Sequence, residues 1–224
     1  MKTTSNVTVI IPVKNGEMYI TEAIKSVINQ TRSVAQIIVV DDHSTDNTID
    51  LVRKIPNIDV IENFSHGQSA AINHGLRHAR GAFIGFIDHD DIWDSRKNEL
   101  SLRLFEKETQ LNVVSVGVKN FEKGDTGSRF KDLGSSRVFG ACLFEREVFD
   151  VVGLLNETIN HHSIVEWWSR KNAENLDIGN IEDSLYYRRI HEKNSGKISR
   201  EAARKDLFSI LRKSKAGKVS SERT

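Results

Sequence analysis

The sequence predicts an α/β domain built on a mostly parallel, Rossmann-like sheet with helices on both faces. Between residues 7 and 93, short apolar runs alternate with segments whose apolar residues recur at helical spacing. That alternation is typical of a parallel sheet. A hydrophobic content of 38%, with 28% charged residues and only two prolines, is ordinary for a globular protein. We therefore expect one core and no long disordered linker.

Four apolar runs in the first half are predicted to be buried strands, because they are short, apolar and bounded by turn residues. They are residues 7–12, 37–40, 58–61 and 82–87. Helices are predicted between them, over residues 20–28, around residues 49–55 and from Gly67 to Ala79. Ser44 and Asp46 are natural N-caps for the second of these helices.

The second half is predicted to contain a helix over residues 95–107 and a strand over 111–118. The polar stretch 122–136 is predicted to be a hairpin loop or a mobile lid. The chain length fits one large domain with a short appendage. We expect that domain to span residues 1–198.

The C-terminal segment, residues 199–224, is predicted to be a basic amphipathic helix and tail. From Lys193 to Thr224, ten Lys/Arg residues stand against three Asp/Glu residues, although the whole chain has a net charge of only +1. The simplest interpretation is a solvated end or a helix packed on the domain. Peripheral contact with an anionic membrane surface is the alternative. We do not expect nucleic acid as a partner.

Cysteine usage and hydropathy bear on the compartment. The single cysteine, Cys142, excludes an internal disulfide and a multi-cysteine metal site, and it is predicted to be a small buried apolar residue. The polar start, Met1 to Asn6, resembles neither a signal peptide nor an anchor. No apolar run approaches the ~20 residues that span a bilayer. We therefore expect a cytoplasmic protein, with the inner membrane surface as its only membrane contact.

Acidic residues follow two of the predicted strands. Asp42 follows the second strand, and Asp88, Asp90 and Asp91 follow the fourth. The carboxyl ends of parallel strands meet at one edge of a sheet, where such folds bind ligands. Three carboxylates within four residues repel one another unless they stay in water, pair with cations or hold a metal. Mg²⁺ or Mn²⁺ beside a phosphate would explain the pattern; a polar loop before the next helix is the alternative.

Four sequence motifs occur in order along the first half of the chain. They are Val-Thr-Val-Ile-Ile-Pro-Val-Lys-Asn-Gly from Val7, Ile-Val-Val-Asp-Asp-His-Ser-Thr-Asp-Asn-Thr from Ile38, His-Gly-Gln-Ser-Ala-Ala-Ile-Asn-His-Gly from His66 and Phe-Ile-Asp-His-Asp-Asp-Ile-Trp from Phe86. Together they resemble family 2 glycosyltransferases with the GT-A fold, over residues 7–195. The resemblance implies inverting transfer of a sugar from a nucleotide diphosphate sugar, commonly a UDP-sugar, with Mn²⁺ or Mg²⁺. The implied acceptor is an unidentified glycan, lipid-linked or protein hydroxyl.

The resemblance also implies roles for the two halves and for individual residues. Residues 1–93 would bind the nucleotide sugar and residues 94–198 the acceptor. Asp42 would accept a hydrogen bond from the base, and Asp91 would cap or orient its loop. The other implied nucleotide-sugar contacts are Pro12, Lys14, Asn15, Asn73, Asp88 and Arg189, and the implied metal ligands are Asp88, Asp90 and His191. Many family members have an aromatic residue at the position of Lys14, so this chain departs from that pattern.

The general base of an inverting transfer is not where the resemblance places it. Family members supply an Asp from a Glu-Asp pair before a Trp/Phe-x-Arg helix, but this chain has Ser163-Ile164 there. Serine without an activating partner is too weak a base, and isoleucine has no titratable group. The candidates are Glu166, one helical turn along, and His161 or His162 just before the helix. Glu166 could instead pair with Arg170 at i,i+4, in which case the chain could bind a sugar nucleotide without transferring it.

Overall fold

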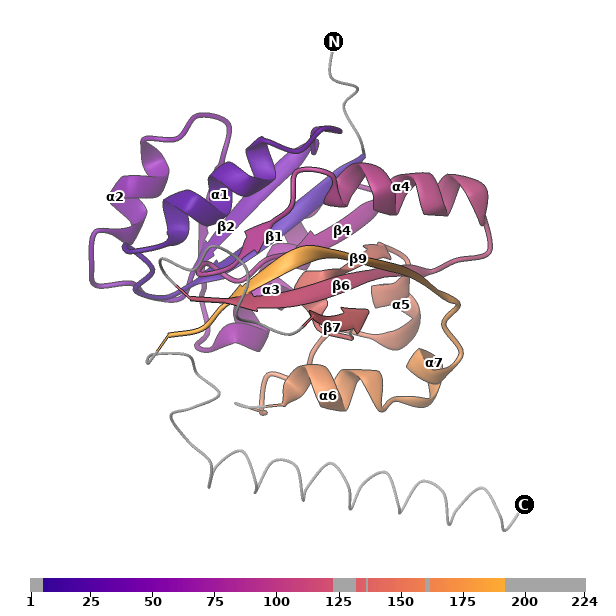
Figure 1. Ribbon diagram of the computed structural model, residues 1–224. Coiled ribbons are helices and arrows are strands. Elements are labelled where there is room, and N and C mark those ends of the chain that lie inside the picture. The colour runs from indigo at the N-terminus through magenta and orange to yellow at the C-terminus, as the bar shows by residue number, and fades with distance from the viewer. Residues whose placement is uncertain (1–5, 123–131, 136, 160–161, 192–224) are drawn as a thin grey trace.

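The computed structural model describes residues 6–122, 132–135, 137–159 and 162–191. Strands and helices alternate through the first half of this part of the chain, and they form one sheet with helices on both faces (Figure 1). The predicted basic helix 199–224, the candidate base His161 and residues 123–131 of the polar stretch lie outside the described residues. None of the described helices is both long enough and apolar enough to cross a membrane.

Within the described residues, the sheet has nine strands in the order β3-β2-β1-β4-β8-β6-β9-β5, with β7 paired to β6 beside this path. The strands are β1 Val7–Val13, β2 Gln36–Asp41, β3 Asp59–Glu62, β4 Phe83–Phe86, β5 Ile92–Trp93, β6 Val113–Phe121, β7 Asp132–Ser135, β8 Cys142–Glu145 and β9 Ile178–Arg189. The first four strands pair in parallel, and β9 is parallel to β6. Strand β8 enters antiparallel between β4 and β6. The predicted parallel arrangement is confirmed for the first half, and the second half makes the sheet mixed.

The helices form two layers, one on each face of the sheet. The layer at the top of Figure 1 contains α1 (Ile20–Ile28), α2 (Thr48–Arg53) and α4 (Lys97–Lys107). The opposite layer contains α3 (Gln68–His78), α5 (Val148–Val152), α6 (Ser163–Trp168) and α7 (Lys171–Glu174). A 3₁₀ turn at Phe139–Ala141 precedes β8.

The central strands are buried on both faces because their sequences are almost continuously apolar. Val9 and Ile11 of β1 face the core beneath α1 and α4, whereas Ile10 faces the core beneath α3. Two-sided burial is what continuous apolar runs predict for parallel strands. The second core is completed by mutually packed aromatic rings from both halves of the chain, those of Phe86, Phe139, Phe144, Phe149, Trp167 and Trp168.

The start of α2 differs from the prediction. The helix begins at Thr48, later than a cap at Ser44 would place it. The N-cap is Asn47, whose side chain makes no capping hydrogen bond; Asp46 lies one residue before it, and its Oδ1 atom accepts the Thr48 N–H at 3.0 Å. Ser44 does not cap the helix, because its Oγ atom accepts the Asn15 N–H at 2.9 Å. Ser44 therefore joins the loop after β2 to the loop after β1.

Candidate active site

A cavity of about 860 Å³ opens at the carboxyl ends of β1, β2 and β4. Its lining includes seven of the predicted ligand-binding residues, Pro12, Lys14, Asn15, Asp42, Asp88, Asp90 and His191. The register of adjacent parallel strands explains part of this convergence, since Val13 pairs with Asp41 and so puts Lys14 beside Asp42. The volume is in the range of cavities that enclose small-molecule ligands. The two acidic strand ends therefore share one cleft.

Hydrogen bonds from main-chain N–H groups to side-chain oxygens join the loop after β1 to the loop after β2 and to the first residue of α2. The Asn15 Oδ1 atom accepts the Thr45 N–H at 2.8 Å, and the Gly16 N–H donates to Thr48 Oγ1 at 2.8 Å. Asn15 adopts a φ of 53°, a left-handed conformation that asparagine tolerates better than most residues. The Asn15 side chain thus stabilises the wall of the cavity.

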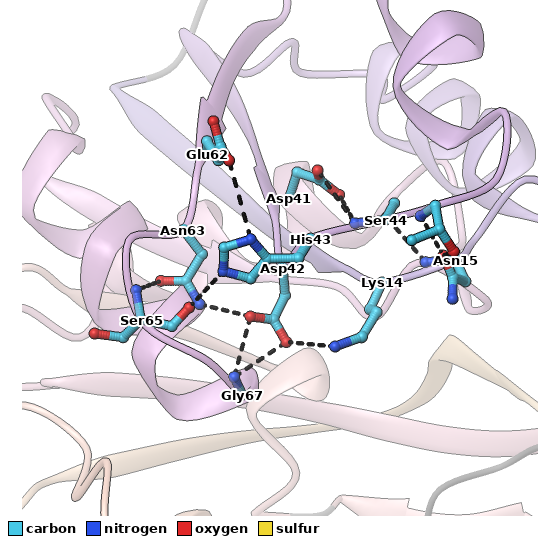
Figure 2. Close-up of polar contacts among 11 residues, drawn as sticks. Lys14, Asn15, Asp41, Asp42, His43, Ser44, Glu62, Asn63, Ser65 and Gly67 are labelled. Carbon is cyan, nitrogen blue, oxygen red and sulfur yellow. Dashed lines mark hydrogen bonds and ion pairs between the residues drawn. The ribbon is translucent and has the colours of Figure 1, made fainter.

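Asp42 lies at the end of β2 with its carboxylate held by the following loop (Figure 2). Asp42 Oδ1 accepts a hydrogen bond from Asn63 Nδ2 at 2.8 Å, and the Gly67 N–H donates to both carboxylate oxygens at 3.0 Å. The Lys14 ammonium lies 3.9 Å from Asp42 Oδ2, and its side chain is 54% exposed. This carboxylate is therefore fixed in place and presents an acceptor next to an exposed donor.

The His43 ring contacts the same loop, which also holds Asp42 (Figure 2). Its Nε2 atom lies 3.0 Å from the Ser65 carbonyl oxygen, and its Nδ1 atom lies 3.9 Å from Glu62 Oε1. Potential ligand atoms of Asp42, His43 and His66 lie within 4.8 Å of one another. The Asp42 oxygens already accept hydrogen bonds and have an ammonium beside them, so we assign no cation to this group. His43 is a loop residue.

The β4 end is different, because its carboxylates face one another. Potential ligand atoms of Asp88, Asp90 and Asp91 lie within 4.8 Å of one another. Burial and the neighbouring Asp90 raise the pKa of Asp88 to about 6, although Gln68 Nε2 donates to its Oδ1 atom at 2.9 Å. The His191 Nε2 atom lies 2.8 Å from Asp90 Oδ2. Carboxylate oxygens with one imidazole are a donor set that fits Mn²⁺ or Mg²⁺.

Asp91 is bound to the protein on both of its oxygens. Its Oδ1 atom accepts the Arg189 N–H at 2.8 Å, and its Oδ2 atom accepts the Tyr186 hydroxyl. Burial, with Asp88 and Asp90 nearby, raises the pKa of Asp91 well above its ordinary value. Asp91 therefore anchors the loop to β9, which agrees with the orienting role expected from the sequence.

The cavity is lined by Arg188 of β9 and not by the neighbouring Arg189 that the resemblance implied. Arg189 is predicted to contact the nucleotide, but it is 4% exposed and is not among the described residues that line the cavity. Arg188 lines the cavity instead. Successive strand residues point to opposite faces, so a one-residue error reverses the side chain. Tyr186, two residues before Arg188, contacts Asp91 and marks the face that points to the site.

Asn73 is also absent from the described cavity lining. It is 1% exposed, and its side-chain amide bonds to the main chain of Leu155 in both directions, at 2.9 Å each. The same amide donates to Glu157 Oε1 at 2.8 Å. The structure therefore corrects the predicted nucleotide contact, because this side chain faces the second half of the chain and fixes the segment after α5.

The predicted base candidates lie on or beside α6, and neither described candidate lines the cavity. Both Glu166 oxygens bind Arg170, whose Nε and Nη2 atoms lie 3.1 Å and 2.8 Å away. Arg170 also donates to the carbonyl oxygens of Val152 and Leu154. His162 precedes the helix with a φ of 61°. The structure favours the alternative interpretation of Glu166, a helix ion pair that ties α6 to α5.

Comparison with protein families and curated proteins gives consistent matches. A family model described as glycosyl transferase family 2 matches residues 8–162, more than half of the chain. The minor teichoic acid biosynthesis protein GgaB of Bacillus subtilis is 37% identical over 127 residues, which cover 53% of this chain and 14% of GgaB. The Escherichia coli UDP-Glc:alpha-D-GlcNAc-diphosphoundecaprenol beta-1,3-glucosyltransferase WfgD is 35% identical over 119 residues, which cover 52% of this chain and 46% of WfgD. The chain thus spans less than half the length of either protein.

Solved structures with the same fold are also found. Residues 1–349 of Staphylococcus aureus TarS, in complex with UDP-GlcNAc, align with a TM-score of 0.73 and 23% identity over 91% of this chain and 65% of that one. The mannosyltransferase PcManGT from Pyrobaculum calidifontis, in complex with GDP-Man and Mn²⁺, aligns with a TM-score of 0.63 and 19% identity over 84% of this chain and 58% of that one. At these identities the alignments establish the fold.

Proposed function

Because the chain belongs to glycosyltransferase family 2, we propose that it transfers a sugar from a nucleotide diphosphate sugar, with a UDP-sugar as the first donor to test. The family and the GT-A fold predicted from the sequence are confirmed by the family match and the structural neighbours. The observation that carries the proposal is the meeting of Asp42, Asp88, Asp90 and His191 in one cavity. That arrangement gives a nucleotide separate contacts for its base and its diphosphate.

Asp42 and Lys14 would bind the base. Asp42 is held by Asn63 and Gly67, so it presents an acceptor whose position is set before any ligand arrives. Lys14 can donate to a carbonyl oxygen of the base, because its ammonium is only loosely paired with Asp42 at 3.9 Å. This donor and acceptor would take the place of the aromatic stacking contact found in many family members.

Asp88, Asp90 and His191 would hold a divalent cation, and their donor atoms fit Mn²⁺ or Mg²⁺. When bound there, such a cation neutralises negative charge on the diphosphate leaving group. Arg188 lines the same cavity and would contact the diphosphate directly. Gln68 holds the Asp88 carboxylate through its Nε2 atom.

The proposed reaction is an inverting displacement. The acceptor oxygen forms a bond to the anomeric carbon, the bond from that carbon to the diphosphate breaks, and the acceptor proton passes to a base. Ser163 and Ile164 cannot be that base, and the Glu166 carboxylate is engaged by Arg170. WfgD is named for a lipid-linked diphosphate sugar acceptor, so we propose acceptors of that class as the first to test.

Nucleotide binding and sugar transfer can be tested separately. Calorimetry with UDP, CDP, GDP and ADP, with Mn²⁺ or with EDTA, measures donor binding and its metal dependence. Release of UDP from a panel of UDP-sugars, with and without lipid-linked acceptors, measures hydrolysis and transfer. Absence of nucleotide binding would refute the proposed function. Binding without turnover would identify the second candidate, a sugar-nucleotide-binding module, which the missing acidic pair at Ser163-Ile164 favours.

A further inference from the structure

Arg189 is a buried cation at the junction of three segments behind the cavity wall. Its Nη2 atom lies 2.6 Å from Glu22 Oε2 on α1, and its side chain is 5% exposed. Its Nε atom donates to the main-chain oxygen of Asp90 at 2.8 Å, and its main-chain N–H donates to Asp91 Oδ1 at 2.8 Å. This one residue therefore joins α1, the end of β9 and the acidic loop after β4.

Aromatic rings complete the surroundings of Arg189. The guanidinium carbon lies 4.6 Å from the centre of the Tyr19 ring and 4.5 Å from that of Phe121. The Tyr19 ring contacts the His191 ring, with 5.3 Å between their centres, and His191 Nε2 lies 2.8 Å from Asp90 Oδ2. Arg189 thus contacts the main chain of one proposed metal ligand and the ring that packs against the other.

We propose that Arg189 is a positioning residue that holds Asp90 and His191 at the separation needed to share one divalent cation. The inference rests on the proposed function, and it gives Arg189 a role without contact to ligand or metal. Carboxylates in one loop repel one another, so the loop needs an external restraint. Groups that orient metal ligands change metal affinity by about 10–100-fold when they are removed.

The chemistry of the side chain makes this role specific to arginine. A planar guanidinium donates to the Asp90 carbonyl and to the Glu22 carboxylate from different nitrogen atoms while its carbon stays near two rings. A lysine ammonium is a compact charge that cannot keep both directed contacts and the ring contacts. Arg189→Lys should therefore preserve the charge and lose the restraint.

The test measures Mn²⁺ binding directly. Free Mn²⁺ is titrated by its electron paramagnetic resonance signal, in the presence of UDP, for wild type, Arg189→Met and Arg189→Lys. UDP binding in EDTA is measured by calorimetry at a temperature at which every variant is folded. We expect Arg189→Met to weaken Mn²⁺ binding by about 10-fold or more and Arg189→Lys to recover little of it. Metal-free UDP binding should stay at the wild-type value, because Asp42 and Lys14 are unchanged.

Arg170→Met is the matched control. Arg170 also pairs with a glutamate and donates to main-chain oxygens, but it lies outside the described cavity lining. Its loss should lower stability and leave Mn²⁺ affinity unchanged. Wild-type Mn²⁺ affinity in Arg189→Met would overturn the inference; if that variant does not fold, wild-type affinity in Arg189→Lys would overturn it. A wild-type chain that binds UDP but no Mn²⁺ would also overturn it, whereas one that binds neither would refute the proposed function itself.

Discussion

The two acidic strand ends of the cleft have similar sequences and opposite environments. At the end of β2, Asp42 accepts hydrogen bonds from Asn63 and Gly67 and has the Lys14 ammonium nearby. At the end of β4, carboxylates lie close to one another, and burial together with Asp90 raises the pKa of Asp88 to about 6. The Asp42 carboxylate at the first end has hydrogen-bond donors and a cation within the protein, whereas the carboxylates at the second end carry excess negative charge.

Because of this difference, the β2 end is suited to recognise the nucleobase and the β4 end is suited to bind a cation. A carboxylate fixed by neutral donors can accept a hydrogen bond in a defined direction, which suits a nucleobase. A group of mutually repelling carboxylates gains most from a cation. The sequence Asp-Asp at one end and Asp-His-Asp-Asp at the other does not reveal this division, because the neutralising groups come from distant segments. Substitutions at each end should therefore affect different steps.

Asp90→Ala is expected to have the largest effect. Loss of this ligand should lower metal-dependent transfer or donor hydrolysis by about 100-fold or more, and UDP binding in EDTA should remain. Turnover assays with a Mn²⁺ titration measure the first effect, and calorimetry measures the second. Asp150→Ala, an exposed acid on α5, is the control and should behave as wild type. Unchanged turnover in Asp90→Ala would remove Asp90 from the mechanism.

Asp42→Asn should have the next largest effect, and it should act on nucleotide binding with or without metal. The new amide places a donor against donors from Gly67 or Lys14, which costs about 1–3 kcal/mol in the free energy of unfolding. Loss of the acceptor should weaken UDP binding by about 10-fold, or roughly 1.4 kcal/mol. Urea unfolding and calorimetry in EDTA measure the two quantities. A variant that loses only Mn²⁺ affinity would contradict the division between the two ends.

Lys14→Met should have a smaller effect, because the Lys14 side chain is 54% exposed and its ion pair with Asp42 is loose. A contact that an exposed ammonium makes to the base should be worth about as much as an exposed ion pair, about 0.2–1 kcal/mol, so UDP affinity should fall by about 1.4- to 5-fold. Calorimetry at low and high salt should show the difference shrinking as salt screens the ammonium. Lys54→Met, at an exposed site outside the cavity, should leave UDP affinity unchanged.

Lys97→Met should change stability without changing binding, because Lys97 belongs to neither acidic end. Its ammonium lies 3.9 Å from the centre of the Trp93 ring, and burial lowers its pKa to about 7 from 10.5. Between those pKa values the unfolded chain holds a proton that the folded chain lacks, so wild-type stability rises with pH across that window. The variant should be more stable at pH 7 by roughly 1–3 kcal/mol, given about 1.4 kcal/mol per pKa unit and the lost ring contact.

Urea unfolding at pH 7 and near pH 10 measures this advantage, which should shrink at the higher pH. UDP affinity should match that of wild type. A constant advantage at both pH values would show that the pKa of Lys97 is not lowered by burial.

The apolar patterns predict most of the fold, because continuous apolar runs leave few alternatives to a two-sided sheet. They do not predict β8, whose antiparallel place between β4 and β6 depends on pairing between residues far apart in the chain. The residues of the site divide in the same way, into those that local patterns predict and those that depend on distant parts of the chain. Residues next to strand ends, such as Asp42 and Asp90, can be located from the sequence, since strand polarity decides where they meet.

Side chains on β9 are harder to place. The pairing of β9 with β6 contains register irregularities near Gly117. The alternation of side chains along β9 therefore cannot be read from the sequence alone, and the sequence does not show which arginine faces the cavity. Asn73 is misplaced for another reason: its partners at Leu155 and Glu157 lie about eighty residues away. The role of Glu166 depends on whether Arg170 is close enough to pair with it. The i,i+4 spacing makes this ion pair one of two alternatives, and the structure favours it.

The insertion of β8 beside β4 determines how the chain can be divided. Glu145, Phe144 and Leu143 pair with residues 83–85, so a fragment that stops at residue 93 would leave one edge of β4 with unpaired main-chain groups, a known route to aggregation. It would also expose Phe86, which packs against rings from beyond residue 138. The segments proposed to bind donor and acceptor are therefore expected to fold as one cooperative unit, and an isolated N-terminal fragment should not persist as a soluble monomer.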